Sequence, residues 1–103
     1  MYVSITGLKP KGFFTSIIFW LHAIPTLRQA RKAIGIIHCA AKSVNGVHHT
    51  ITAWKTKADM SRYVASGSHL RATKVFSKIA SGRTITFEAK SIPSWDDALV
   101  KWE

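Results

Sequence analysis

The stretch from Phe13 to Ile24 is the most apolar part of the chain, and it limits what the chain can fold into. A helix that spans a bilayer needs about 20 apolar residues, and this stretch is much shorter. Pro25 and the basic segment 28–32 follow it, without a small-x-small cleavage site directly after the run, which argues against a secretory leader. We therefore interpret the stretch as a buried helix of a cytoplasmic protein without a transmembrane segment. Contact with a membrane surface stays open, because its aromatic residues adjoin cations.

Length and composition indicate one small basic domain, residues 1–103. The chain has 15 Lys and Arg against 5 Asp and Glu, which gives a net charge of +10, and 47% of its residues are hydrophobic. That apolar share is enough for a packed core and argues against disorder. Cys39 is the single cysteine, which excludes an intrachain disulfide and an all-cysteine metal site. No other group of metal-ligating residues with suitable spacing is evident, so we expect no metal site.

The order of the elements indicates an α+β fold. Alternating residues predict strands at 2–7, 34–41, 47–54 and 83–89. Helical spacing predicts helices at 13–33, from Thr56 to Gly82 with a break at 66–68, and from Ser94 to Trp102. The order βαββαβ is that of a ferredoxin-like antiparallel sheet with the helices on one face, here with an added C-terminal helix.

Short motifs fix several boundaries. Thr56 followed by Asp59, and Ser94 before Trp95, are typical helix N-caps. Pro25 should kink or restart the first helix, because proline has no N–H to donate. Asn45-Gly46 predicts the hairpin between the second and third strands, since both residues tolerate positive φ.

The strands divide into two unlike faces. One is apolar and is expected to lie under the helices: Val3, Ile5, Ile37, Cys39, Ala41, Ile51, Ala53, Ile85, Phe87 and Ala89. The other is mixed and is expected to meet a second sheet in a homodimer: Tyr2, Ser4, Thr6, Ile36, His38, Ala40, Thr50, Thr52, Trp54, Thr84, Thr86 and Glu88. This division requires a bulge at Gly46, because a plain two-residue turn would place Cys39 opposite Thr52.

The segment ITAWKTKADMSRYVASGSHLRA, residues 51–72, resembles the central signature of the dimeric α+β barrel superfamily, which includes the antibiotic biosynthesis monooxygenases. In that pattern a strand ends in Trp, a helix with an aromatic residue follows, and a small-residue break precedes a His. Here these are Trp54, Tyr63, the break 66–68 and His69. The upstream QARKAIGII is similar to the same group, although Ile34 replaces the frequent Pro. The downstream PSWDDALVKW resembles the subgroup near spheroidene monooxygenase-like proteins.

The resemblance implies a small apolar or aromatic ligand between sheet and helices, with haem open as a cofactor. His69 is the candidate catalytic residue, as a proton-transfer group or haem ligand, or else it packs locally at the helix break. Trp54, Tyr63 and His38 are the candidate ligand-binding residues, and Trp54 could instead fill a dimer interface. Glu88 shares the face of His38, where a buried carboxyl could act as a base or pair with a cation.

Three functions stay open: a monooxygenase-like enzyme, a non-enzymatic ligand-binding protein, and a basic protein that docks on nucleic acid or an anionic membrane. The cations fall at Lys9, Lys11, Arg28, Arg31, Lys32, Lys55, Lys57, Arg71, Lys74 and Lys78. Because they are spread over several elements, we expect only weak, charge-driven binding to nucleic acid.

Overall fold

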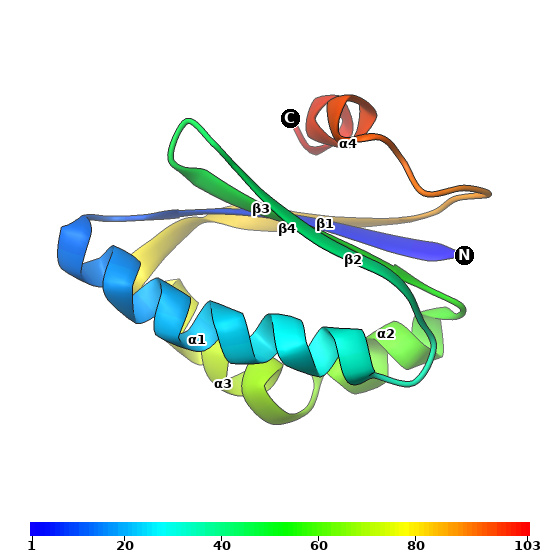
Figure 1. Ribbon diagram of the computed structural model, residues 1–103, viewed down its shortest axis with the longest axis horizontal. Helices are drawn as coiled ribbons and strands as arrows, with labels where there is room; N and C mark the ends of the chain where they lie inside the picture. The colour runs from blue at the N-terminus through cyan, green and yellow to red at the C-terminus, as the bar shows by residue number, and fades with distance from the viewer.

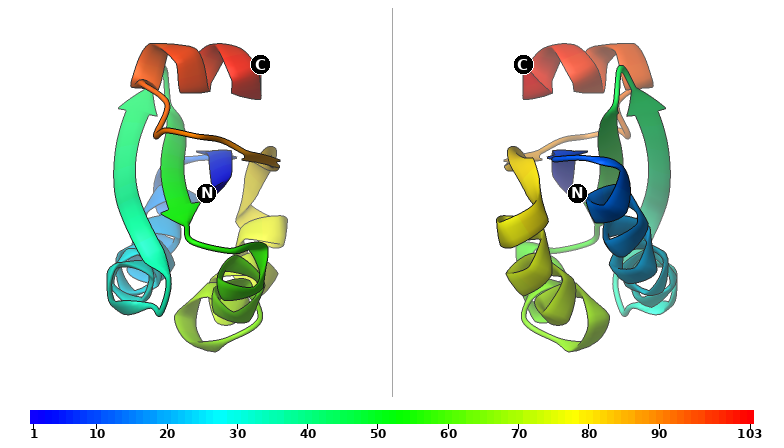
Figure 2. Two further views of the ribbon diagram at one scale, coloured as in Figure 1. Left: turned by 90° about the vertical axis from the view of Figure 1, so that its right-hand side faces the viewer. Right: turned by 90° about the vertical axis from the view of Figure 1, so that its left-hand side faces the viewer.

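A computed structural model describes residues 1–103 as three layers (Figure 1). In chain order the elements are β1 (Tyr2–Pro10), α1 (Phe13–Lys32), β2 (Ile36–Val44), β3 (Val47–Trp54), α2 (Lys57–Val64), α3 (Gly67–Ile79), β4 (Ala80–Glu88) and α4 (Trp95–Trp102). The sheet forms the middle layer, with α1, α2 and α3 on one side and α4 alone on the other, as the end-on views in Figure 2 also show. The predicted α+β, ferredoxin-like fold with an added C-terminal helix is confirmed.

The sheet is antiparallel, with the strand order β2-β3-β1-β4. Its centre repeats one pattern on three neighbouring strands, a hydroxyl residue on each side of an isoleucine. The three copies are 4–6, 50–52 and 84–86. Their register aligns Ile5 with Ile51 on one side and with Ile85 on the other. Since side chains alternate along a strand, the isoleucines share one face and the hydroxyl residues share the other.

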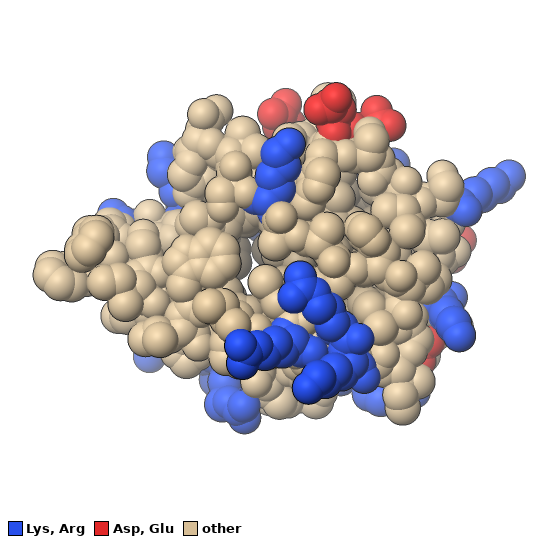
Figure 3. Space-filling view, viewed as in Figure 1, with Lys and Arg blue, Asp and Glu red and all other residues tan.

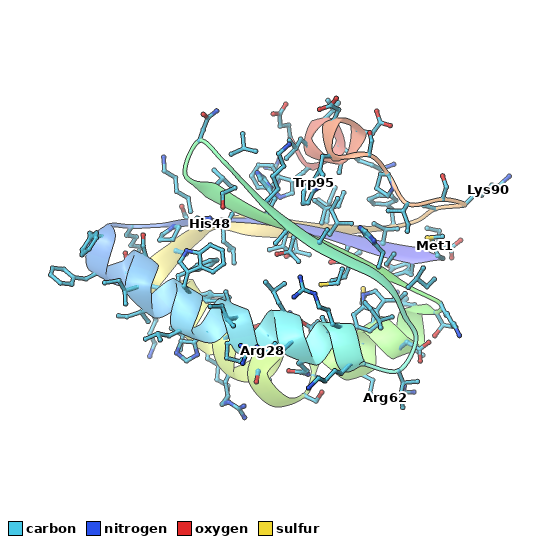
Figure 4. The ribbon with its side chains drawn as sticks, viewed as in Figure 1. Met1, Arg28, His48, Arg62, Lys90 and Trp95 are labelled. Carbon is cyan, nitrogen blue, oxygen red and sulfur yellow. The ribbon has the colours of Figure 1, made fainter.

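The isoleucine face lies under α4. Val3, Ile5, Ile51 and Ala53 form the fully buried core there together with Ala98 of α4. Trp95 and Trp102 close the edges of this core, and Figure 4 shows Trp95 on the side of the sheet away from α1. The helix starts as the sequence predicts, because the Ser94 hydroxyl accepts a hydrogen bond from the amide of Asp97 at 3.2 Å. An eight-residue helix is thus enough to cover the centre of this sheet face.

The hydroxyl face lies under α1, α2 and α3, so two expectations about the faces are wrong. The apolar face is covered by α4 alone, not by the two βαβ helices. The face with Thr50, Thr52 and Trp54 cannot be the surface of a sheet-to-sheet dimer, because the protein's own helices cover it. Alternation separated the faces correctly in β1, β3 and β4, although not in β2, and it carries no information about which helix covers which face.

The hairpin between β2 and β3 differs from the bulged turn expected at Gly46. Asn45 and Gly46 have φ values of 51° and 78° and form a plain two-residue turn between paired Val44 and Val47. The irregularity lies at the other end of β2, between Ile36 and His38. Cys39 therefore pairs with Thr52 and faces the three helices, while His38 pairs with Ala53 on the α4 face.

Helix α1 runs through Pro25 as one element of 20 residues, so proline does not restart it. Pro25 cannot donate to the Leu21 carbonyl, but Leu21 is exposed and water can serve that carbonyl. Phe19, Ala23 and Ala30 are the buried side chains of α1, whereas most of the apolar stretch is exposed. The expectation of a buried helix is therefore wrong for its outer face. No helix of this fold is both long and apolar enough to cross a membrane.

Candidate functional site

A cavity of about 570 Å³ lies between the hydroxyl face of the sheet and the three helices above it. The floor residues come from three strands: Ser4, Thr6, Thr50, Thr52, Thr84 and Thr86. The roof includes Phe19, Trp20, Ala23, Leu27, Met60, Tyr63, His69, Ala72 and Phe76. Hydroxyl groups on one side and apolar or aromatic side chains on the other make a site for a small, mostly apolar ligand with a few polar atoms.

The floor consists of two rows that cross the strands. Ser4 pairs with Thr52 and Thr86, and Thr6 pairs with Thr50 and Thr84. The Thr6 and Thr84 hydroxyls are 2.8 Å apart and hydrogen-bonded. Towards β4, the edge strand, the threonines are exposed, whereas Thr52 is buried. The cavity is thus deep towards β3 and open towards β4.

His69 and Tyr63 meet at the roof, with ring centroids 4.7 Å apart in an edge-on arrangement. The break between α2 and α3 is held by Gln29 of α1. Its side-chain NH₂ donates to the Ser66 carbonyl at 3.0 Å, and its side-chain oxygen accepts from the backbone N–H of His69 at 2.9 Å. Gln29 therefore fixes the first turn of α3 and with it the position of the His69 ring.

Burial lowers the pKa of His69 below the ordinary value of 6.5, so its imidazole is neutral near pH 7. Burial also raises the pKa of Tyr63 well above its usual range. The Tyr63 hydroxyl donates to the Thr26 carbonyl at 3.1 Å. Tyr63 thus contributes an aromatic wall with its proton retained, and His69 is the neighbouring group able to accept a proton.

Trp54 is fully buried behind Tyr63, with ring centroids 5.0 Å apart. It packs in a small cluster with Ala30 and Tyr63, flanked by Cys39 and Met60, rather than lining the cavity. Its indole N–H is buried without a hydrogen-bond partner. Trp54 therefore supports the Tyr63 wall from behind. Burial raises the pKa of the nearby Cys39 thiol, which keeps it protonated.

His48 is a cavity residue that the sequence did not single out. Its ring stacks on Phe19 at 4.9 Å between centroids, and it lies between β3 and the first half of α1 (Figure 4). Its Nδ1 is 2.6 Å from the Ser43 hydroxyl. Burial, and then the neighbouring His49, lower its pKa. The available signal was its position in β3, two residues before Thr50 and therefore on the same face.

His38 does not join the other candidates. It lies on the α4 face because of the irregularity at the start of β2, so its expected position beside Thr50 and Thr52 is wrong. Glu88 does lie on the hydroxyl face, beside Tyr2 at the exposed end of β4, and does not line the cavity. Nowhere do three His, Cys, Asp or Glu side chains gather in a way that could hold a metal ion.

The cavity contains no acid, because none of its lining residues is Asp or Glu. Lys42 and Arg83 lie at its edge, but they pair in the sheet with His49 and Gly7 of the α4 face, and the Arg83 guanidinium donates to the Trp102 carbonyl there. A polar atom of a ligand would find hydroxyl groups and imidazoles in the cavity, whereas a cationic ligand would find no counter-charge. The cavity therefore suits a neutral ligand better than a cationic one.

Comparison with solved structures identifies the fold. The cofactor-independent oxygenase SnoaB from Streptomyces nogalater is similar with a TM-score of 0.72 and 12% identity, over 88% of this chain and 94% of that one. A Deinococcus radiodurans protein assigned to the antibiotic biosynthesis monooxygenases gives 0.78 and 12%, over 91% and 97%. Rv0793 from Mycobacterium tuberculosis gives 0.77 and 7%, over 91% and 100%. No family model and no curated protein matches the sequence.

Proposed function

We infer the function of the chain from its fold, which is that of the antibiotic biosynthesis monooxygenase-like proteins, a dimeric α+β barrel group. We propose that the cavity binds a small apolar or aromatic molecule and that the protein oxygenates it without a bound cofactor. The observation that carries the proposal is the pairing of a neutral His69 with an acid-free, partly hydroxylated cavity of about 570 Å³. The further likeness to the spheroidene monooxygenase subgroup stays a prediction.

The proposed chemistry begins with proton transfer. His69 accepts a proton from a weakly acidic O–H or C–H group of the bound ligand, which leaves an electron-rich anion beside the hydroxyl donors of the floor. Such an anion can react with O₂ directly. The ligand supplies all four electrons that O₂ takes up: it loses two hydrogens and gains one oxygen atom, and the second oxygen atom leaves with those two hydrogens as water. Apolar walls of Phe19, Leu27 and Phe76 keep bulk water away from the anion.

Haem is the cofactor left open by the resemblance, and the residues present fit its chemistry. His48 and His69 both use Nδ1 in their nearest hydrogen-bond contacts, so the other ring nitrogen of either could bind iron. A haem bound there would supply one-electron and O₂ chemistry that the side chains lack. A Soret band in the absorption spectrum of the purified protein would indicate that the site binds haem.

The test uses 1-naphthol, an aromatic molecule with a weakly acidic O–H group. We expect saturable binding, measured by the quenching of naphthol fluorescence. We also expect one mole of O₂ to be consumed for each mole of naphthoquinone formed. His69→Ala should abolish O₂ consumption while binding is retained. His38→Ala, which removes a histidine from the opposite face, should change neither. Binding without O₂ consumption in the wild-type protein would indicate a non-enzymatic ligand-binding protein. Absence of binding would contradict both the oxygenase and the ligand-binding protein.

Self-association is a separate proposal, since the resemblance implies a homodimer. The surface first expected for it is covered, so any dimer uses another surface than the Thr50 face. Light scattering at micromolar concentration measures the mass directly. Weak binding to nucleic acid through charge alone likewise stays a prediction, and it should vanish near physiological salt.

A further inference from the structure

The outward face of α1 is apolar over the first half of the helix. Successive residues of an α-helix are rotated by about 100°, which places positions 13, 17, 21 and 24 on one side. All four side chains are exposed, with Phe13 at 75% and Leu21 at 69%, and Phe14 beside them is exposed at 78%. The buried residues Phe19, Ala23 and Ala30 lie on the opposite side. The helix thus presents large apolar side chains to solvent on its outer face.

The second half of the same face is basic. Arg28, Arg31 and Lys32 are exposed and lie at the angular positions of the apolar residues, and Lys11 precedes the helix. Figure 3 shows Lys and Arg gathered over the second half of α1, while its first half carries none on this face. No Asp or Glu occurs in α1. Most of the acids, Asp96, Asp97 and Glu103, lie on or next to α4, on the far side of the sheet.

We propose that the outward face of α1 binds the surface of an anionic lipid bilayer. An exposed row of large apolar side chains indicates an interaction surface. A face that joins such a row to cations, without acids, fits the region where acyl chains meet anionic headgroups. A second copy of the chain fits less well, because it would bring another charge of +10 against the same cations. Nucleic acid would engage the cations but leave Phe13 and Leu21 in water.

The geometry gives an orientation. A helix of 20 residues is about 30 Å long and lies flat in the interface, with its apolar half inserted and its basic half at the headgroups. The acidic α4 then points away from the membrane. Trp20 lines both the cavity and the shallow apolar groove on the outer face of α1. The site for an apolar ligand is therefore only one side chain away from the membrane-binding face.

The test is co-sedimentation at about 0.15 M ionic strength with vesicles of phosphatidylcholine alone or of equal parts phosphatidylcholine and phosphatidylserine. We expect binding to the phosphatidylserine vesicles, little binding to phosphatidylcholine, and a blue shift of tryptophan emission on binding. Phe13→Ser with Leu21→Ser, and separately Arg28→Glu with Arg31→Glu, should each weaken binding by at least about tenfold. Circular dichroism and thermal melting show whether each variant keeps its fold.

Control variants carry comparable changes away from α1. Val100→Ser removes an equally exposed apolar side chain (73%) from α4, and Lys90→Glu with Lys101→Glu makes the same change in net charge. Both should bind within about twofold of the wild type. The proposal is overturned if the wild type does not sediment, or if folded α1 variants bind like the wild type. It is also overturned if Leu21→Ser dissociates a dimer instead, or if Arg28→Glu removes RNA binding at this salt while vesicle binding is unchanged.

Discussion

The two faces of the central sheet are built from the same three strand segments, but one face packs against a helix and the other lines a cavity. On the α4 face, Ile5 and Ile51 are fully buried among apolar neighbours. On the opposite face, the threonines and serine that flank these isoleucines line a cavity. A repeated hydroxyl-isoleucine-hydroxyl pattern thus builds the core on one face and the floor of the cavity, the proposed ligand site, on the other. Substitutions at neighbouring positions of one strand can therefore be used to test the two functions separately.

The largest expected effect comes from the closed face. Ile51→Ala should lower the free energy of unfolding by about 3 kcal/mol, because a fully buried side chain is removed and a cavity remains. The matched control is Thr50→Ala, one residue away and half-buried on the open face, which should cost less than about 1 kcal/mol. Urea unfolding measures both. Equal losses would contradict the division of the two faces.

Trp102→Ala tests what α4 contributes to that face. The Trp102 ring meets His49 edge-on at 4.8 Å and its N–H donates to the Arg83 carbonyl at 3.0 Å. Its six-membered ring fills the space above Gly7, where a Cβ would collide with it. We expect a loss of about 2 kcal/mol, together with increased binding of the dye ANS to the uncovered apolar face. Trp20→Ala, on α1, should cost less because Trp20 is partly exposed.

A smaller effect on the free energy of unfolding is expected from pH, through one histidine on each face. Burial lowers the pKa of His49 on the closed face and of His69 on the open face below 6.5. The unfolded chain therefore binds protons that the folded protein does not. Stability should be fully present above about pH 6.5 and should fall as the pH drops from there towards the lower pKa of the folded state.

His49→Gln and His69→Gln should each remove part of this pH dependence, measured by urea unfolding between pH 7 and pH 5. His22→Gln changes a histidine on α1 and serves as the control. An unchanged slope in the two variants would show that other groups are responsible. Only His69→Gln should also alter the pH profile of O₂ consumption.

The smallest effect on stability is expected for Thr52→Val, on the buried part of the open face. The shapes of the two side chains are similar and the Thr52 hydroxyl makes no hydrogen bond within the chain, so stability should change by less than about 1 kcal/mol. Naphthol affinity should nevertheless change, because the floor loses a hydroxyl group. A large loss of stability would show that the hydroxyl face also supports the fold.

Local motifs were predicted well because their physics is local. The Thr56 hydroxyl accepts from the Asp59 amide at 3.1 Å and starts α2 as expected, and Ser94 does the same for α4. The Asn45-Gly46 turn was also predicted, but as a bulged turn, because only a bulge there kept each face of the sheet uniform in character. The structure places the extra residue between Ile36 and His38, close behind the turn at Gly35, which was expected only to end the preceding helix.

The site was only partly predictable for a related reason. The family resemblance named Tyr63 and His69 as candidates, and the structure has them in contact. The predicted position of His38 depended on the expected register of β2, and both were wrong. Which helix covers which face of the sheet depends on α4 folding back over the isoleucine face. This packing involves residues far apart in the sequence, so no single segment predicts it. His48 was not among the candidates, although its place in β3 two residues before Thr50 puts it on the same face.

The arrangement of β1 has a consequence for how the chain folds. β1 lies in the middle of the sheet between β3 and β4, and the amide of Ala89 donates to the Met1 carbonyl at 2.9 Å. Because synthesis proceeds from the N-terminus, β1 is made long before β4 and α4. Pairing over such distances in sequence is slow compared with helix formation. Val3 and Ile5 therefore stay open to water, and to other nascent chains, until the last helix of this fold is complete.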